Sequence, residues 1–150
     1  TPRLDAKPAL AEEAEITADA LPRVSSHQIR TASLRKEGDG HYWATARVND
    51  TPVKFLVDTG ASLVALSKRD ARRIGINIDN LQKNADVRTA AGRVKASTTV
   101  IDEIVIDGVT VRNVSAVVME DGLEHSLLGM SFLNRLEGWD VTTNAIVIHE

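Results

Sequence analysis

Through most of the chain, apolar and polar residues alternate in short runs separated by turn-forming residues. Residues 41–48, HYWATARV, and 53–57, VKFLV, flank the turn NDTP and predict a hairpin that leads directly into Asp58. Residues 86–97, DVRTAAGRVKAS, predict a second hairpin with Gly92 at its tip. These runs indicate a fold built from short strands.

A third hairpin is predicted at residues 102–119, DEIVIDGVTVRNVSAVVM, where Asp107-Gly108 has the composition of a two-residue turn. Residues 145–150, AIVIHE, predict a closing strand. That strand either pairs within its own chain or adds an edge to a sheet shared by two chains, and the pattern leaves both interpretations open.

Two segments have helical character instead. Residues 65–75, ALSKRDARRIG, predict a helix with Ser67 as its N-cap and Gly75 as the residue that ends it. Residues 125–139 contain an apolar pair, a glycine and a short helical run, HSLLGMSFLNRLEGW. The sum is a mainly β fold, a small closed barrel or pseudo-barrel with two short helices.

The first 35 residues differ from the rest of the chain. Residues 9–24, ALAEEAEITADALPRV, are rich in Ala and Glu and have a weak helical period. They predict a linker or stalk, partly helical or disordered, or else a pro-segment that folds over a cleft. The thin apolar face favours the linker, and residues 36–150 are expected to form the folded domain.

Composition excludes several classes of function. A net charge of -3 and an aromatic content of 3% provide neither the positive field nor the stacking side chains of a nucleic-acid-binding protein. The absence of cysteine excludes disulfides, Cys-ligated zinc and thiol catalysis. The four histidines show no metal-ligand spacing. Because the chain begins with Thr1 rather than Met, we expect a fragment or a mature form.

Asp58 stands out because it interrupts an apolar run, KFLVDTGASLVALS, at residues 54–67. A buried carboxylate without a partner costs several kcal/mol, so a fold seldom retains one there without a reason. The triplet Asp58-Thr59-Gly60, considered alone, is also a common turn at the end of a strand. No second Asp-Thr-Gly or Asp-Ser-Gly occurs in the chain.

Taken together, these motifs resemble the retropepsin-like aspartic proteases, and in particular their bacterial single-domain members. The resemblance covers residues 38–148 and rests on four segments, which are VDTGAS, the hairpin RTAAGRV, LLG followed by MSFLNRL, and the insertion SKRDARRIG. It implies a fold of the retropepsin, or acid protease, type in residues 36–150.

The resemblance also implies an active site. Two carboxylates that share one proton would activate a water against the scissile peptide bond, so Asp58 is the expected catalytic residue and no cofactor or metal is required. Since the chain is half the length of a two-lobed pepsin, each copy of a homodimer would contribute one Asp58. Thr59, Gly60 and Ala61 are expected to support the site. The stretch Ala90-Ala91-Gly92 is expected to act as a substrate-binding flap.

The implied activity is that of an endopeptidase acting on protein or peptide substrates. By the same resemblance we expect a periplasmic location with a membrane tether upstream of the sequence given. Two alternatives stay open. The barrel could be a non-catalytic dimerisation or peptide-binding module, or a latent protease held inactive by its N-terminal segment.

Overall fold

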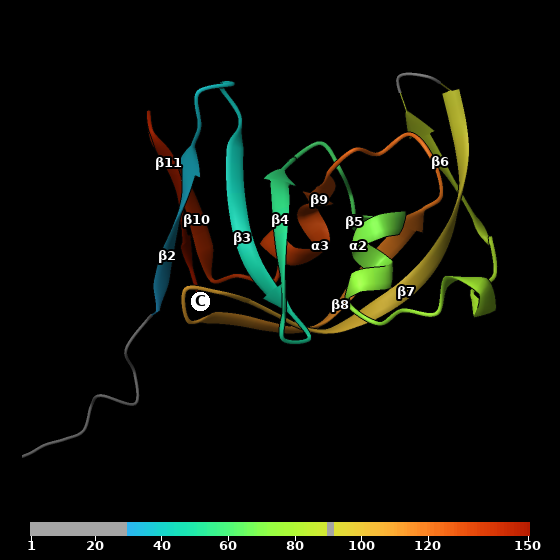
Figure 1. The fold of residues 1–150 in the computed structure, drawn as a ribbon. Coiled ribbons are helices and arrows are strands. Elements are labelled where there is room, and N and C mark those ends of the chain that lie inside the picture. The colour runs from blue at the N-terminus through green and yellow to red at the C-terminus, as the bar shows by residue number, and fades with distance from the viewer. Residues whose placement is uncertain (1–29, 90–91) are drawn as a thin grey trace, which may run out of the picture.

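The predicted strands join into one sheet, and Figure 1 shows this sheet together with two short α-helices that pack against it. The computed structural model describes residues 30–89 and 92–150. Within them the strands are β2 (Thr31–Lys36), β3 (Tyr42–Val48), β4 (Thr51–Val57), β5 (Val64–Ser67), β6 (Ala85–Thr89), β7 (Gly92–Ile106), β8 (Val109–Met119), β9 (Ser126–Leu128), β10 (Gly138–Val141) and β11 (Ala145–His149). The helices are α2 (Lys68–Arg73), the 3₁₀-helix η3 (Ile78–Asn80) and α3 (Met130–Leu133).

Six of these strands close into a barrel. Their order is β3-β4-β9-β5-β8-β7, and β7 pairs back with β3 through Arg47 with Val105 and Val48 with Ile104. Most neighbours are antiparallel, whereas β4 with β9 and β5 with β8 run parallel. The prediction of a mainly β fold with a small closed barrel and two short helices is confirmed.

The turns explain the register of two hairpins. Asp107 and Gly108 both have positive φ, 46° and 86°, which is the geometry of a primed two-residue turn. The predicted hairpin therefore forms between β7 and β8, with Ile106 opposite Val109. In the first hairpin Asn49-Asp50 makes the same kind of turn, so Thr51-Pro52 already belongs to β4.

Helix α2 begins and ends at the predicted residues. The Ser67 side chain accepts a hydrogen bond from the backbone N–H of Asp70, and Gly75 follows the helix with a φ of +91°. The residues just before the cap, however, form strand β5 rather than a first helical turn. Because β5 is only four residues long, its apolar run carries too short a period to be distinguished from a helix.

Strand β7 is a single strand of 15 residues, where the sequence predicted parts of two separate hairpins. Its first residues pair with β6, its middle pairs with β8, and its last residues also contact β3. The β6–β7 hairpin is therefore continuous with the barrel wall. In Figure 1 it rises beside the loop that follows β4.

The two ends of the described chain pair with each other. Strand β2 pairs with β11, so the boundary expected at residue 35 falls inside a strand of the sheet. Residues 1–29 lie outside the described residues. Strand β11 also pairs with β10, so it has neighbours on both sides within its own chain and offers no free edge to a second copy. Of its two interpretations, the intrachain one is correct.

The barrel interior is apolar. A second, smaller cluster of Ala65, Ala96, Val117 and Met119 lies where β5, β7 and β8 meet beneath the β6–β7 hairpin. The largest side chains of the main core are Phe55, Phe132, Leu34, Leu66, Ile101 and Ile104. In the part of the chain that the structure describes, no helix has the length and apolarity needed to cross a membrane.

Candidate active site

The loop after β4 is fixed by backbone hydrogen bonds to the segment that carries β9 and α3. The N–H of Asp58 donates to the carbonyl of Leu128 at 3.1 Å, and the N–H of Met130 donates to the carbonyl of Ala61 at 2.8 Å. Ser131 adds a third connection, since its Oγ accepts from the N–H of Val64 at 2.8 Å. The loop therefore has a defined position at one end of the barrel.

Asp58, Thr59, Gly60 and Ala61 lie together in this loop. The Asp58 side chain is half-buried in the single chain, and its Oδ1 accepts a hydrogen bond from the N–H of Gly60 at 2.9 Å. A Cβ on Gly60 would lie 3.2 Å from that same oxygen. Glycine thus keeps the space directly beside the carboxylate open, while Thr59 is exposed.

Gly129 supports the loop from below. A Cβ at this position would lie 2.8 Å from the carbonyl oxygen of Ala61 and closer still to that of Leu63. Both atoms belong to backbone, which cannot rotate out of the way as a side chain can. The loop that carries Asp58 therefore packs directly on the glycine of the LLG segment.

Asp58 faces a cleft of about 590 Å³ between this loop and the β6–β7 hairpin. The cleft is lined mainly by apolar side chains, with Asp86 and Arg88 contributed by β6. Leu128 is fully buried in the core, whereas Leu127 is half-buried and lines the cleft. The apolar residues of the lining include Leu63, Val87, Val117, Met119, Leu123 and Leu127.

The β6–β7 hairpin, at whose tip the flap is expected, lies beside the cleft. Gly92 opens β7 opposite Thr89 and has a φ of +112°, a conformation that favours glycine. Ala90 and Ala91, which the sequence placed at the same tip, lie outside the described residues. The part of the hairpin that lines the cleft is further down, at Ala85–Arg88 and Thr98.

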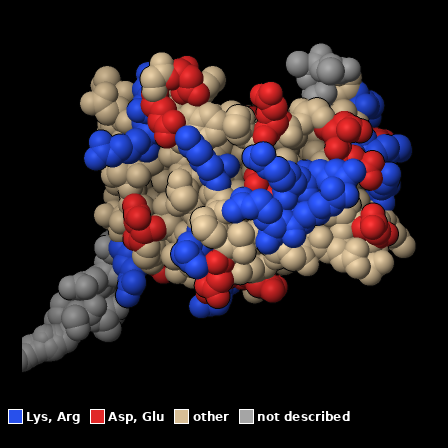
Figure 2. All heavy atoms as spheres, viewed as in Figure 1, with Lys and Arg blue, Asp and Glu red and all other residues tan. Residues whose placement is uncertain are grey.

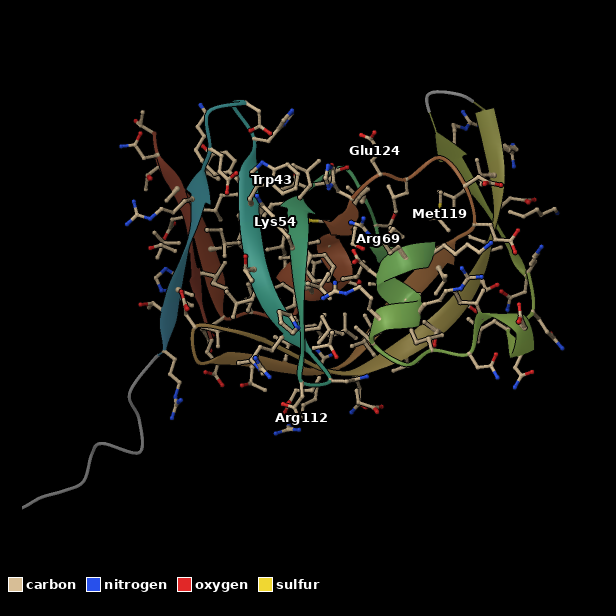
Figure 3. All side chains as sticks on the ribbon, in the orientation of Figure 1. Trp43, Lys54, Arg69, Arg112, Met119 and Glu124 are labelled. Atoms are coloured by element: carbon tan, nitrogen blue, oxygen red, sulfur yellow. The ribbon has the colours of Figure 1, made fainter. Side chains whose placement is uncertain are left out.

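A second cavity, of about 650 Å³, adjoins the first along the segment from Gly122 to Leu127. It is lined in part by Glu124 and His125, and the edge of the His125 ring meets Trp43 with centroids 5.0 Å apart. Lys54 Nζ lies 4.7 Å from the centre of the Trp43 ring, and Figure 3 shows these two side chains together beside β4. The cleft thus continues past Leu127 towards a surface that contains His125, Trp43 and Lys54, which also pairs with Glu37 at 3.2 Å.

Asp39 completes this surface. It accepts hydrogen bonds from the N–H of His41 at 2.9 Å and from Trp43 Nε1 at 3.0 Å. The pKa of Asp39 lies below its ordinary value. The backbone hydrogen bond from His41 is the largest cause, and the hydrogen bond from the Trp43 indole adds to it. Trp43 is therefore oriented by a charged acceptor as well as by packing.

A buried polar cluster joins α2 to β9, and the sequence did not reveal it. The Asp70 side chain is 8% exposed and accepts a hydrogen bond from Ser126 Oγ at 2.6 Å. Ser126 Oγ in turn accepts from the N–H of Ser67 at 3.0 Å, and Arg73 pairs with the other oxygen of Asp70 at 3.2 Å. In the sequence, the one sign that Asp70 is not an ordinary surface charge is its position three residues after the N-cap.

We expect Asp70→Ala to lower the free energy of unfolding by about 2 kcal/mol, because the buried hydroxyl of Ser126 loses its acceptor. Urea denaturation measures this change. Asp86→Ala is a matched control, since it breaks an exposed ion pair with Lys95 and should cost less than about 1 kcal/mol. Equal losses in the two variants would show that the buried cluster contributes nothing special.

Within residues 30–89 and 92–150, no group of three or more His, Asp or Glu side chains is placed to hold a metal ion. The functional groups at the cleft include carboxylates, hydroxyls and backbone amides. The carboxylates of its lining are Asp58 and Asp86.

Comparison with known proteins also indicates a family of aspartic proteases. Residues 44–135 match the family model described as "gag-polyprotein putative aspartyl protease". The uncharacterized protein RP867 of Rickettsia prowazekii (strain Madrid E) is 35% identical over 124 residues, which are 83% of this chain and 53% of the relative. An uncharacterized protein encoded in the cobV 5' region of a Sinorhizobium species is 42% identical over 118 residues, 78% of this chain and 51% of the relative. The chain thus spans about half the length of the curated relatives it matches.

Two solved structures share the architecture. The crystal structure of a retropepsin-like aspartic protease from Rickettsia conorii has a TM-score of 0.75 and 34% identity, covering 81% of this chain and 92% of that one. EIAV protease complexed with the inhibitor HBY-793 has a TM-score of 0.58 and 21% identity over 71% of this chain and 97% of that one, which shows the fold alone. This chain therefore belongs to the family of retropepsin-like aspartic proteases.

Proposed function

We propose that this chain is an aspartic endopeptidase whose active site forms between two copies, each of which contributes Asp58. Family and fold support a protease function. The observation that carries the finer proposal is the position of Asp58, which is half-buried at the inner end of an apolar cleft and held by the Gly60 amide. An apolar cleft with a few polar groups in its wall is typical of an active site.

Among the described residues that line the cleft, Asp86 is the one carboxylate besides Asp58. Its Oδ1 already pairs with Lys95 Nζ at 3.0 Å on an exposed hairpin, so Asp86 is engaged elsewhere. General acid–base hydrolysis needs one protonated and one ionised group. A second Asp58 from a two-fold related copy would meet that requirement, because two adjacent carboxylates share one proton.

In this mechanism the ionised carboxylate accepts a proton from a water molecule, whose oxygen forms a bond to the carbonyl carbon of the peptide. The protonated carboxyl donates a hydrogen bond to the carbonyl oxygen, which becomes a hydroxyl in the tetrahedral intermediate. Proton transfer to the amide nitrogen then breaks the C–N bond and leaves a carboxylic acid and an amine. The Gly60 amide fixes the orientation of Asp58 throughout.

The lining of the cleft supports a preference for substrates with apolar side chains. Side chains of Val87, Val117, Met119 and Leu123 surround the space next to Asp58. Apolar side chains on either side of the cut bond would bury surface against them, at about 25 cal/mol per Å². We therefore expect extended protein segments with apolar residues at the cleavage site.

A subunit-mixing experiment tests both parts of the proposal. Wild-type protein is mixed with increasing amounts of Asp58→Asn at constant total concentration, and the cleavage of casein is followed after native mass spectrometry has shown complete exchange. If two copies form one site and mixed pairs are inactive, activity falls with the square of the wild-type fraction.

A linear fall would show that each chain works alone, and it would overturn the shared site. No cleavage by the wild type at any pH would favour a binding module instead. Asp86→Asn serves as the control for mixing, because it also removes a carboxylate from the cleft and should leave the activity of every mixture close to that of the wild type.

A further inference from the structure

Helix α2 presents a strongly basic surface away from the cleft. Its six residues include four cations, Lys68, Arg69, Arg72 and Arg73, and one acid, Asp70. Figure 2 shows Lys and Arg side chains gathered over the position of α2, and Figure 3 shows Arg69 on this helix. The whole chain carries a net charge of -3, so this local excess of positive charge is opposite in sign to the rest.

Burial explains why the exposed face of α2 itself carries only positive charge. Asp70, the acid of this helix, is turned inward to Ser126 and Arg73 and adds no negative charge to the face. Arg73 is further held by the carbonyl of Pro52 at 2.9 Å. Among the described residues, Arg69 and Arg72 have no ion pair, and both are exposed. They leave two positive charges without compensation.

The chain itself contains a matching acidic stretch. Between Pro8 and Pro22 there are four acids, Glu12, Glu13, Glu15 and Asp19, and no Lys or Arg. This stretch lies outside the described residues. Its acids are separated by one to four positions, a density of charge similar to that on α2.

The chain is long enough to bring the two together. Arg30 comes 18 positions after Glu12, and a fully extended chain of that length spans about 60 Å. A folded domain of this size has a radius of gyration of about 14 Å, so the acidic stretch can reach any face. Covalent attachment also raises its local concentration to about the millimolar range, where individually weak ion pairs suffice for binding.

We propose that residues 12–19 dock on the basic face of α2 in the same chain. Arg69 and Arg72 are the principal contacts. Lys68 contributes less, because it lies near Glu120, whose carboxylate is also held by Lys83 at 2.8 Å. The proposal is independent of the proposed function, because it concerns a surface that does not line the cleft. An anionic membrane surface is the rival occupant of the same cations.

The absence of cysteine allows a direct test with the full chain. A nitroxide on Ala14→Cys is expected to remove most of the NMR peak intensity of the backbone amides of residues 68–73 at low salt. At about 1 M salt, where the Debye length is about 3 Å, the intensity should return. The double variant Arg69→Glu/Arg72→Glu should likewise restore it.

Charge reversal on both sides makes the test specific. Adding Glu12→Lys/Glu15→Lys to Arg69→Glu/Arg72→Glu should bring back the loss of intensity at α2. Arg35→Glu/Arg112→Glu is the matched control, because it makes the same change of charge on β2 and β8, and Figure 3 shows Arg112 on a different side from Arg69. Circular dichroism establishes whether each variant is folded. If Arg69→Glu/Arg72→Glu is unfolded, Arg69→Gln/Arg72→Gln takes its place in the test for restored intensity.

Three results would overturn the proposal. Unchanged amide intensities at α2 in low salt would show that the stretch does not dock there. In a second sample, ¹⁵N-labelled chains without a nitroxide are mixed with unlabelled chains that carry it. If the amides of α2 lose as much intensity there as they do within one chain, the docking occurs between chains. The third result combines two measurements. If the α2 amides keep their intensity and the chain binds phosphatidylglycerol vesicles only when Arg69 and Arg72 are present, the face binds a membrane surface instead.

Discussion

Replacing Asp58 by Asn is expected to lower kcat/KM for a peptide substrate by about a thousandfold or more, because both the base and the acid of the shared site are lost together. The substitution keeps the size of the side chain and removes its ability to exchange a proton. Continuous cleavage of a fluorogenic peptide with apolar residues around the cut bond measures the effect.

The same variant should remain folded. An Asn Oδ1 can still accept the hydrogen bond from the Gly60 N–H, so the free energy of unfolding should change by less than about 1 kcal/mol. Asp86→Asn, at the other carboxylate of the cleft, should retain nearly full activity. Wild-type rates in Asp58→Asn would remove the catalytic assignment, and equal losses in the two variants would point to a general effect of charge in the cleft.

Gly129→Ala is expected to lower the free energy of unfolding by about 3 kcal/mol or more and to abolish activity. The new Cβ would collide with the carbonyl oxygens of Ala61 and Leu63, so either the loop that carries Asp58 or the start of α3 must move. Chemical denaturation and the peptide assay measure the two effects separately.

Two other glycines are suitable controls for Gly129. A Cβ at Gly38 meets nothing within 4 Å, so Gly38→Ala should be neutral or slightly stabilising. Gly60→Ala places its Cβ 3.2 Å from Asp58 Oδ1, which can shift by rotation, so activity should suffer more than stability. A Gly129→Ala variant as stable as Gly38→Ala would contradict the close packing described above.

Local chemistry made several elements predictable from the sequence. Asp107-Gly108 specifies a primed turn by its tolerance of positive φ, and the structure has that turn. Ser67 and Gly75 mark the ends of α2 through a side-chain cap and a left-handed residue. The Asp58-Thr59-Gly60 loop was also found in this way, because an acid within an apolar run is visible without any knowledge of distant contacts.

Features that depend on distant residues were not predictable. Strand β5 is too short to show a period, and its neighbours β8 and β9 come much later in the chain. The bond from Ser126 to Asp70 joins positions 56 residues apart, and neither residue has a local pattern that names the other. Leu127 lines the cleft while Leu128 is buried, and an apolar pair does not reveal which member faces the cleft.

The three-residue strand β9 has a consequence for the order of assembly. It sits between β4 and β5, and its Leu128 carbonyl receives the Asp58 amide, so the loop gains its shape only when a late part of the chain inserts between two early ones. Contacts of such high sequence separation are acquired late in folding. A nascent polypeptide emerging from the ribosome would therefore carry no formed cleft until Gly129 had been synthesised.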